Sequence, residues 1–461
     1  MTLFDYLSKH AGDRLPMHMP GHKRKARAKY LKKLAADIDI TEIHGADDLH
    51  DPRGIIKEAQ ERASALWGAE NSHILVGGST AGILAGIYSM LLPGDKVIIA
   101  RNCHKSVYHA MEICGAVPIY VLPESDDKTG FFLSVDASEI DAALSANPDA
   151  KLVVITSPTY EGVVSDVCGI ANVCHAHRVP LLVDEAHGAH FGICDKFPDD
   201  AVACGADIVV RSLHKTLPSL TQTAMAHVTG LASDEKFARA LNIFETSSPS
   251  YLLMAAADGC VDFCENHREL FEKWSDAIDG FASKIKLKNL SLFCGEGAYG
   301  FDKSKIVVST ACAGISGFEL ARILREEYKI EVEMAGVRHI VAMTGVFDGK
   351  SELSKLSRAL EKIDKTLSAS ASKARKISAV PQYVITAKEA LAYPSCEVFS
   401  GEAEGCVCAE YVWAYPPGIP LIVPGEIVDE STLALINELI SVGADVKAAD
   451  RSLKTLIVIQ K

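Results

Sequence analysis

The sequence predicts an α/β fold built on a buried, mostly parallel sheet with helices on both faces. Six short runs rich in Val, Ile and Leu are spaced along residues 70–215, and helix-length segments separate most of them. Such near-continuous apolar runs are typical of strands covered on both sides. Ligands bind such sheets beyond the carboxyl ends of the strands, so the residues after each run are the functional candidates. The runs are SHILVG, DKVIIA, PIYVL, KLVVITS, PLLVDEAH and DIVVRSLH.

Composition and charge narrow the class of protein. The chain has 461 residues, of which 48% are hydrophobic, so it is long enough for two or three domains with a sizeable core. Its formal net charge of −13 argues against a nucleic-acid partner, because neutralising phosphates requires an excess of Lys and Arg. The same charge suits an enzyme that attracts cationic substrates.

The sequence also predicts a cytoplasmic protein with no membrane partner. Its N-terminus carries charges where a signal peptide needs an apolar stretch, and no apolar run approaches the roughly 20 residues that cross a bilayer. The 13 cysteines are scattered, with no CxxC pair and no zinc-type spacing. We therefore expect reduced, mostly buried thiols and no metal site.

Four segments are expected along the chain. Residues 1–45 form an arm with a short helix and a basic run, Lys23 to Lys33, interpreted as a solvated helix face. Residues 46–290 hold the apolar runs and form the large domain. Residues 291–372 follow a strand, helix, strand, strand, helix pattern typical of a small α/β domain. Residues 373–461 begin in a Ser/Ala/Lys-rich linker and end in a helix and a strand.

The first apolar run leads into glycines and hydroxyls at the start of a helix. Gly78, Ser79 and Thr80 follow the run directly. Free backbone N–H groups at the positive end of a helix dipole bind phosphate. Gly and Ser before a helix are also ordinary capping residues, so this signal alone leaves both interpretations open.

Histidines and an acid follow two further strands. His104 lies beyond the second run, where its imidazole could stack on an aromatic ring or play a structural role. Asp184 ends a fully apolar strand, which is an expensive place for a carboxylate unless a cation or strong donors meet it. Ala186 leaves space, and His187 follows. A metal site would combine Asp184, His187 and His190, but no cysteine or second acidic cluster completes it.

The last run ends in the turn SLHK, which contains Ser212, His214 and Lys215. A basic surface loop would explain this turn alone. Together, the strand ends of this sheet offer a phosphate cradle, a histidine that could stack on a ring, a buried carboxylate and a lysine. Pyridoxal phosphate (PLP) chemistry needs this set of groups. Lys215 would then hold the cofactor aldehyde as a Schiff base, and Asp184 would keep the pyridine nitrogen protonated.

The remaining candidates would surround the cofactor. The phosphate would lie on Gly78, Ser79 and Thr80, with Ser212 and His214 as further donors. The other two candidates would face the ring itself: His104 would cover one ring face and His187 would reach the ring hydroxyl.

Several blocks of the sequence resemble the bacterial ornithine/lysine/arginine decarboxylases of PLP fold type I. The turn SLHKTLPSLTQTA is similar to the lysine signature of that family; Gln222 matches, whereas Pro218 stands where a small residue is more usual. The resemblance covers nearly the whole chain, because the blocks occur in the family's order. The other blocks are MPGHK (19–23), DITEI (39–43), SPTYEG (157–162), DEAHG (184–188), TSSPSYLLMA (246–255) and YPPGIPLIVPGE (415–426).

The resemblance implies a fold, an assembly and further site residues. It implies the aspartate aminotransferase-like fold with a C-terminal decarboxylase-type segment, and the roles given above for Lys215, Asp184 and His104. It implies a homodimer or higher homo-oligomer with composite active sites, in which Ser247 and Ser248 approach the cofactor of the neighbouring subunit. Glu426 is expected to grip a distal cation of the substrate. Members with a separate receiver-like domain form large rings, but only about 45 residues precede the catalytic block here.

The expected reaction is α-decarboxylation of a basic amino acid to an amine and carbon dioxide, as in polyamine biosynthesis. Compact members of the family favour arginine, while lysine and ornithine remain open because side-chain length and charge shape are not readable from sequence. Asp47, Asp48 and Glu42 could add acidic groups to the pocket or be ordinary surface acids.

Two alternatives remain. An aminotransferase or aldolase-type lyase would keep the cofactor and break another bond, and Arg338 could then hold the substrate carboxylate or be an ordinary surface residue. An inactive regulatory protein would keep only the fold. The presence of all the candidate cofactor residues disfavours this second alternative.

Overall fold

A seven-stranded sheet forms the centre of the structure, a computed structural model that describes residues 1–10, 17, 19–20, 22–23, 31–370, 380–415, 418–441 and 443–460. The strand order is β1-β8-β7-β6-β4-β2-β3. The strands are β1 (Asn71–Leu75), β2 (Lys96–Ala100), β3 (Val117–Val121), β4 (Leu152–Thr156), β6 (Leu181–Asp184), β7 (Ile208–Arg211) and β8 (Ala224–Val228).

Six of these strands run in the same direction. β2, β3, β4, β6 and β7 pair in parallel, and β1 shares their direction because both β1 and β7 are antiparallel to β8. The six predicted runs all form strands, so the mostly parallel sheet is confirmed. β8 was not predicted, because its residues AMAHV lack a run of β-branched side chains.

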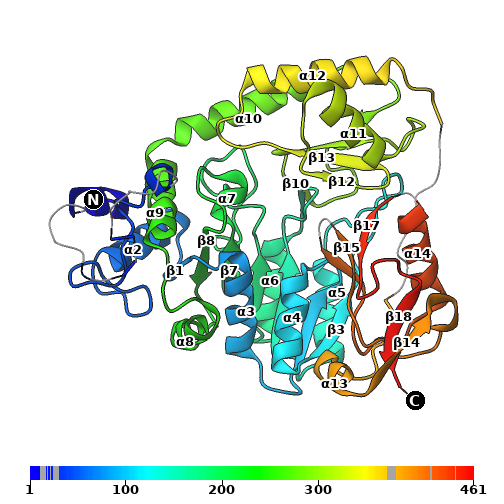
Figure 1. The fold of residues 1–461 in the computed structure, drawn as a ribbon, viewed down its shortest axis with the longest axis horizontal. Helices are drawn as coiled ribbons and strands as arrows, with labels where there is room; N and C mark the ends of the chain where they lie inside the picture. The colour runs from blue at the N-terminus through cyan, green and yellow to red at the C-terminus, as the bar shows by residue number, and fades with distance from the viewer. Residues whose placement is uncertain are drawn as a thin grey trace.

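Helices cover both faces of the sheet. In β1, neighbouring residues pack into two separate cores, whereas the apolar residues of β2, β4, β6 and β7 belong to one cluster. Leu75 packs in a cluster with α3 (Gly78–Met90), α4 (Lys105–Cys114), α5 (Ala137–Ala146) and α6 (Val167–Ala176). Its neighbour Ile74 faces the other way, into a cluster with α2 (Ile55–Trp67), α9 (Tyr251–Asn266) and α10 (Arg268–Ala282). This alternation is the period of two expected of a strand buried on both faces. Figure 1 shows α3 and α4 side by side along the sheet.

Two glycines let α3 lie close against the sheet. A Cβ atom at Gly82 would come 2.7 Å from Cδ1 of Leu75, and one at Gly86 would come 2.6 Å from Cδ1 of Leu182. Larger side chains would push the helix away from the strands. The glycines therefore fix the position of the N-terminus of α3, directly after β1.

The small domain is a four-stranded antiparallel sheet covered by two helices, at the top of Figure 1. Its strand order is β12-β13-β11-β9, which agrees with the predicted strand, helix, strand, strand, helix pattern. A short pair, β5 (Val163–Val164) with β10 (Gly300–Phe301), joins it to the large domain. The elements are β9 (Ser291–Leu292), β11 (Lys305–Ser309), α11 (Gly317–Tyr328), β12 (Met334–Ala335), β13 (His339–Met343) and α12 (Lys350–Asp364).

The C-terminal segment has its own apolar core and lies beside the β3 edge of the large domain in Figure 1. The predicted closing helix and strand are confirmed. A buried ion pair joins this segment to the end of β2, because Nη2 of Arg101 lies 3.0 Å from Oε2 of Glu426. Its elements are α13 (Ala387–Ala392), β14 (Ser395–Phe399), β15 (Val412–Tyr415), β16 (Ile419–Ile422), α14 (Glu430–Ser441), β17 (Asp445–Lys447) and β18 (Thr455–Ile459).

The N-terminal arm begins with the predicted helix, α1 (Leu3–His10), which packs on α9. The predicted helix face from Lys23 to Lys33 lies mostly outside the described residues. Just after the arm, Asp47 accepts backbone N–H groups of Gly54 and Ile56, so its carboxylate fixes the loop that leads into α2. In the part of the chain that the structure describes, no helix is long and apolar enough to span a bilayer.

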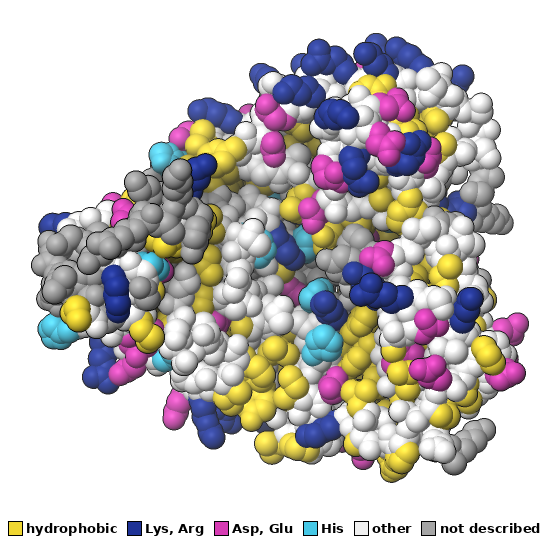
Figure 2. Space-filling view, viewed as in Figure 1, with side chains coloured by type: hydrophobic (Ala, Val, Ile, Leu, Met, Phe, Trp, Pro, Cys, Tyr) yellow, Lys and Arg dark blue, Asp and Glu magenta, His cyan; other side chains and the backbone are white. Residues whose placement is uncertain are grey.

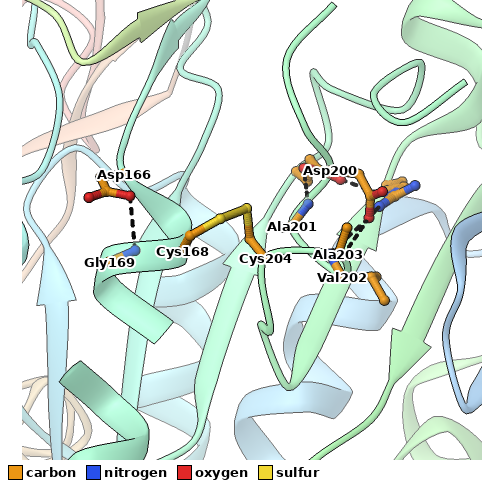
Figure 3. The surroundings of a disulfide bond; sticks show 10 residues. Asp166, Cys168, Gly169, Asp200, Ala201, Val202, Ala203 and Cys204 are labelled. Atoms are coloured by element: carbon orange, nitrogen blue, oxygen red, sulfur yellow. Dashed lines mark hydrogen bonds and ion pairs between the residues drawn. A yellow bond between two sulfur atoms is a disulfide. The ribbon is translucent and has the colours of Figure 1, made fainter. Parts of the chain in front are cut away.

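One pair of cysteines corrects the expectation of reduced thiols throughout. Cys168, in α6, forms a disulfide with Cys204, which precedes β7 (Figure 3). The two residues are 36 positions apart, but their Cα atoms are 4.4 Å apart, which is within the range of disulfides. Sequence spacing could not predict this pair, because the parallel sheet, and not the local sequence, brings α6 against the turn before β7.

A buried lysine links the small domain to the large one. Nζ of Lys305, at the start of β11, donates to the backbone carbonyl of His187 at 2.9 Å, to Oδ2 of Asp302 at 2.9 Å and to Oγ of Ser304 at 3.0 Å. These bonds satisfy all three N–H donors of the ammonium group. Oδ1 of Asp302 lies 3.2 Å from Nε2 of His190, so the network ties β11 to the turn after β6.

We predict that Asp302→Asn lowers the free energy of unfolding by about 3–5 kcal/mol, because it leaves the Lys305 ammonium buried without its carboxylate. Urea denaturation followed by circular dichroism measures this change. Asp279→Asn is the matched control, since it removes an exposed ion pair with Lys303 and should cost at most about 1 kcal/mol. Equal effects of the two substitutions would contradict the role given to the buried pair.

The pair also makes stability depend on pH. Burial alone would raise the pKa of Asp302, but Lys305 and His190 outweigh burial and hold that pKa below its ordinary value. Because the folded-state pKa is the lower one, the stabilisation is complete above the unfolded pKa of about 3.9 and is lost as the pH falls further. In Asp302→Asn, the free energy of unfolding should therefore fall less between neutral and acidic pH than in the wild type.

Candidate active site

A cavity of about 420 Å³ lies where the carboxyl ends of the parallel strands meet the small domain and the C-terminal segment. Residues after β1, β2, β4, β6 and β7 line it, as do residues 336–339 of the small domain and part of α14. Figure 2 shows the corresponding face, where histidine, basic and acidic side chains gather in a hollow between the two domains. Its volume is within the range of small-molecule sites.

Asp184, His187 and Lys215 meet at the base of this cavity. Asp184 ends β6 with only 4% of its surface exposed, and Oδ1 accepts the backbone N–H of Ala186 at 3.1 Å. Nζ of Lys215 lies 2.8 Å from Nε2 of His187. Burial raises the pKa of Asp184 and lowers that of Lys215, and each shift is opposed by the charge of the other residue. Residues from the ends of two strands, β6 and β7, therefore share one site.

His104 also lines the cavity. It caps α4, where Nδ1 accepts the backbone N–H of Ser106 at 3.3 Å, so the ring orientation is fixed by the helix it starts. Burial, together with the positive charges of Lys215 and Lys105, lowers its pKa to about 4. The imidazole is therefore neutral near pH 7, as a ring-stacking partner should be.

The predicted phosphate cradle is formed only in part. Ser79 lines the cavity, and its hydroxyl accepts from Oγ of Ser212 at 3.0 Å. Gly78 has a φ of 74°, which favours glycine and lets the backbone turn into α3. Thr80 is exposed one residue further along the helix, and Nδ1 of His214 lies 2.9 Å from the carbonyl oxygen of Thr223.

A carboxylate that the sequence analysis did not consider lies against this cradle. Oε1 of Glu245 accepts the backbone N–H groups of Val76 at 3.1 Å and Gly77 at 3.0 Å. These two donors immediately precede the residues assigned to phosphate. Burial raises the pKa of Glu245. Gln222, the family-matching residue, donates from Nε2 to the carbonyl oxygen of Val76 at 2.6 Å and so closes the same loop.

Several predicted site residues do not line the cavity in this chain: besides Gly78, Thr80, Ser212 and His214 of the cradle, these are Ser247, Ser248 and Glu426. Ser247 and Ser248 are exposed after α8 (Asp234–Phe244) and do not line it. Glu426 is fully buried in its ion pair with Arg101 and also accepts the backbone N–H of Val423 at 2.9 Å. Because its charge is already matched, its position gives no support to the expected grip on the substrate.

The cavity contains groups to which sequence reasoning assigned no role. Tyr160 and Glu161 come from the block SPTYEG, which was noticed as a family block only, and His339 follows Arg338 in the small domain. The rings of Tyr160 and His187 are 4.4 Å apart, centroid to centroid. The block SPTYEG comes at the end of the apolar run KLVVITS, and this position after a strand could have identified Tyr160 and Glu161 as cavity residues. Lys305, inside an ordinary-looking strand, gave no such signal.

The residues of the cavity fit pyridoxal phosphate. The site holds a lysine, a buried carboxylate, a neutral histidine and hydroxyls at a helix start. Among the described residues, Nδ1 of His187 and Oδ1 of Asn102 are buried without a hydrogen-bond partner. Buried polar atoms are normally hydrogen-bonded, so these two atoms are available to a bound ligand. This donor set suits the ring and phosphate of the cofactor.

Comparison with known proteins agrees with this chemistry. The family model for the major domain of Orn/Lys/Arg decarboxylases matches residues 2–294, and the model for their C-terminal domain matches residues 371–444. The chain is 33% identical to an arginine decarboxylase of Bacillus subtilis (strain 168), over 100% of this chain and 97% of the relative. It is 34% identical to an arginine decarboxylase of Halalkalibacterium halodurans, over 96% and 94%.

A solved structure has the same fold. The lysine decarboxylase LdcF of Francisella novicida superposes with a TM-score of 0.85 and 19% identity, covering 100% of this chain and 81% of the other. The architecture is therefore that of PLP fold type I, as the resemblance implied. With family models over most of its length and relatives above 30% identity along all of it, the chain belongs to the Orn/Lys/Arg decarboxylase family.

Proposed function

We propose that the protein is a PLP-dependent decarboxylase that converts a basic amino acid, with arginine favoured, into the corresponding amine and carbon dioxide. The observation that supports it most is the meeting of Asp184, His187 and Lys215 in one cavity of a chain from this family. Full-length similarity to two arginine decarboxylases supports arginine over lysine and ornithine.

Each residue has a physical task in this proposal. Lys215 holds the cofactor through Nζ, and its lowered pKa makes the amine available as a nucleophile. The Asp184 carboxylate holds a proton on the pyridine nitrogen, while Ser79 and Ser212 hold the phosphate. His104 covers the ring. Bound PLP supplies an electron sink for the pair released when the bond to the carboxylate breaks.

Proton transfer and water exclusion fall to the same residues. His187 Nε2 and Lys215 Nζ are 2.8 Å apart, which is close enough to pass a proton between them. Burial and the charge of Lys215 hold the pKa of His187 well below its ordinary value, so its ring is neutral and, once protonated, gives the proton up readily. The small domain and α14 form part of the cavity wall, which limits the solvent around the substrate carboxylate and favours its loss.

The aminotransferase alternative has one structural argument in its favour. Arg338 lines the cavity, as a residue that holds a substrate carboxylate would. A firm clamp on that carboxylate would stabilise the ground state and oppose decarboxylation. Product analysis separates the two reactions.

We also propose a cytoplasmic homodimer that serves polyamine synthesis. Ser247 and Ser248 are exposed, as residues that reach a neighbouring active site would be in a separate subunit. The division into an arm (1–45), a large domain (46–290), a small domain (291–372) and a C-terminal domain (373–461) is part of the same proposal.

Lys215→Ala should abolish both cofactor attachment and turnover. Without Nζ no covalent link forms, so the visible absorbance band of the protein supplied with PLP should disappear and amine production should fall to the level without enzyme. Absorbance spectroscopy and amine detection give the two readouts. Lys305→Arg keeps a buried cation outside the cavity lining and should retain the band. A persistent band in Lys215→Ala would rule out this residue as the point of attachment.

Asp184→Asn should retain the fold but reduce kcat/KM by roughly 10²–10³-fold, because the negative charge that holds the pyridine proton is lost. Steady-state kinetics with arginine measures the loss. Asp364→Asn, at a buried carboxylate that does not line the cavity, is the control and should leave kcat/KM unchanged. If both variants were fully active, Asp184 would have no part in the reaction.

The holoenzyme given arginine labelled in the carboxyl carbon should release labelled carbon dioxide and agmatine. Lysine and ornithine should react less well, because the full-length relatives are arginine decarboxylases. Thin-layer or mass analysis of the amine measures the preference. Transfer of the amino group to a 2-oxo acid without labelled carbon dioxide would favour the aminotransferase.

A further inference from the structure

One carboxylate in the wall of the cavity has no cation beside it. Glu161 follows β4 and is only 7% exposed, yet it lines the cavity. Among the described residues, Oε2 accepts the hydroxyl hydrogen of Thr159 at 3.0 Å, and Oε1 lies 3.8 Å from Nε2 of His339. No Lys or Arg of the described chain lies within ion-pair distance of it.

His339 does not supply the missing charge. Its ring is 6% exposed, and neither ring nitrogen has a hydrogen-bond partner within the described ranges. Burial lowers its pKa to about 4, so the ring is neutral near pH 7. The surroundings are shaped around this ring: a Cβ at Gly336 would come 2.6 Å from its Cε1, and the ring of Phe131 meets it edge-on with centroids 5.1 Å apart.

Other buried carboxylates of this protein have either a cation or several backbone donors as partners. Asp364 and Glu245, for example, each accept two or more backbone N–H groups. Burying a carboxylate without a partner is expensive, and a matched cation offsets the cost. Ion-paired examples include Asp302 with Lys305 at 2.9 Å, Glu185 with Arg211 at 2.8 Å, and Glu426 with Arg101 at 3.0 Å. Glu161 differs from both groups: it faces the cavity, and among the described residues it has neither a Lys or Arg partner nor a backbone N–H donated by another residue.

We propose that Glu161 binds the cationic end of the substrate side chain, so that the guanidinium or ammonium group completes the ion pair that the protein leaves open. This inference rests on the proposed function. Phe131 and Tyr160, which line the cavity beside it, would cover the methylene groups and offer ring faces to the cation. Glu161 is then the residue that selects basic amino acids, a task that the sequence had assigned to Glu426.

A second acidic residue of the cavity provides the matched control. Glu438 lines the cavity from α14, is half-buried and interacts with other residues. Glu438→Gln and Glu161→Gln change the net charge of the cavity by the same amount. They therefore separate a direct ion pair from a general electrostatic attraction.

The test uses the PLP-loaded enzyme and steady-state kinetics with arginine. Glu161→Gln should raise KM by roughly 10- to 100-fold with a smaller change in kcat, because a buried charge-assisted bond is lost. Inhibition by citrulline, the neutral isostere of arginine, should be unchanged. Glu438→Gln should alter KM by less than about 3-fold. Glu161→Asp keeps the charge and should recover part of the affinity, and the cofactor absorbance band should be intact in every variant.

Two results would overturn the inference while the proposed function stands: an unchanged ratio of arginine to citrulline binding in Glu161→Gln, or equal increases in KM in Glu161→Gln and Glu438→Gln. A wild-type holoenzyme that retains its absorbance band but neither decarboxylates arginine, lysine or ornithine nor shows a spectral change with them would refute the proposed function, and this inference with it.

Discussion

The active site depends on the requirement that parallel strands end at the same edge of a sheet. β1, β2, β4, β6 and β7 run in one direction, so the residues that follow them converge although up to 140 positions of sequence separate them. Asp184 and Lys215 become neighbours of one cavity for this reason alone. Apolar strands on either side bury the carboxylate, and burial raises its pKa. The hydrophobic core and the electrostatics of the site are therefore produced by the same packing.

A second constraint holds the small domain in place over that edge. The ammonium group of Lys305 bonds to the carbonyl of His187, while Asp302 pairs with both Lys305 and His190. The turn after β6 thus contains both His187, which lines the cavity, and His190, which bonds to Asp302 at the junction with the small domain. A shift of the small domain would move His187, which lies 2.8 Å from Lys215. The wall of the cavity and the orientation of the catalytic groups are coupled by buried hydrogen bonds.

Charge pairing gives the buried acids different tasks. Glu426 is neutralised by Arg101 and joins the C-terminal segment to the end of β2, so its contribution is to the architecture that closes the cavity. Glu161 faces the cavity without a basic partner among the described residues, and Asp184 faces it opposite Lys215. Glu245 accepts two backbone donors beside the start of α3. All four carboxylates are buried, so burial does not distinguish their roles. The partner of each carboxylate does.

Most strands of the sheet and the chemistry at their ends can be read from the amino-acid pattern. Short Val, Ile and Leu runs form strands through local propensity and burial. Asp184 ends one such run, and His104 and Lys215 follow two others by a few residues, so their convergence was predictable from topology rules. The partners of the buried side chains depend on the folded arrangement. The Cys168–Cys204 disulfide, the three bonds of Lys305 and the contrast between Glu426 and Glu161 depend on contacts between residues distant in sequence, and side-chain charge pairing leaves no periodic pattern along the chain.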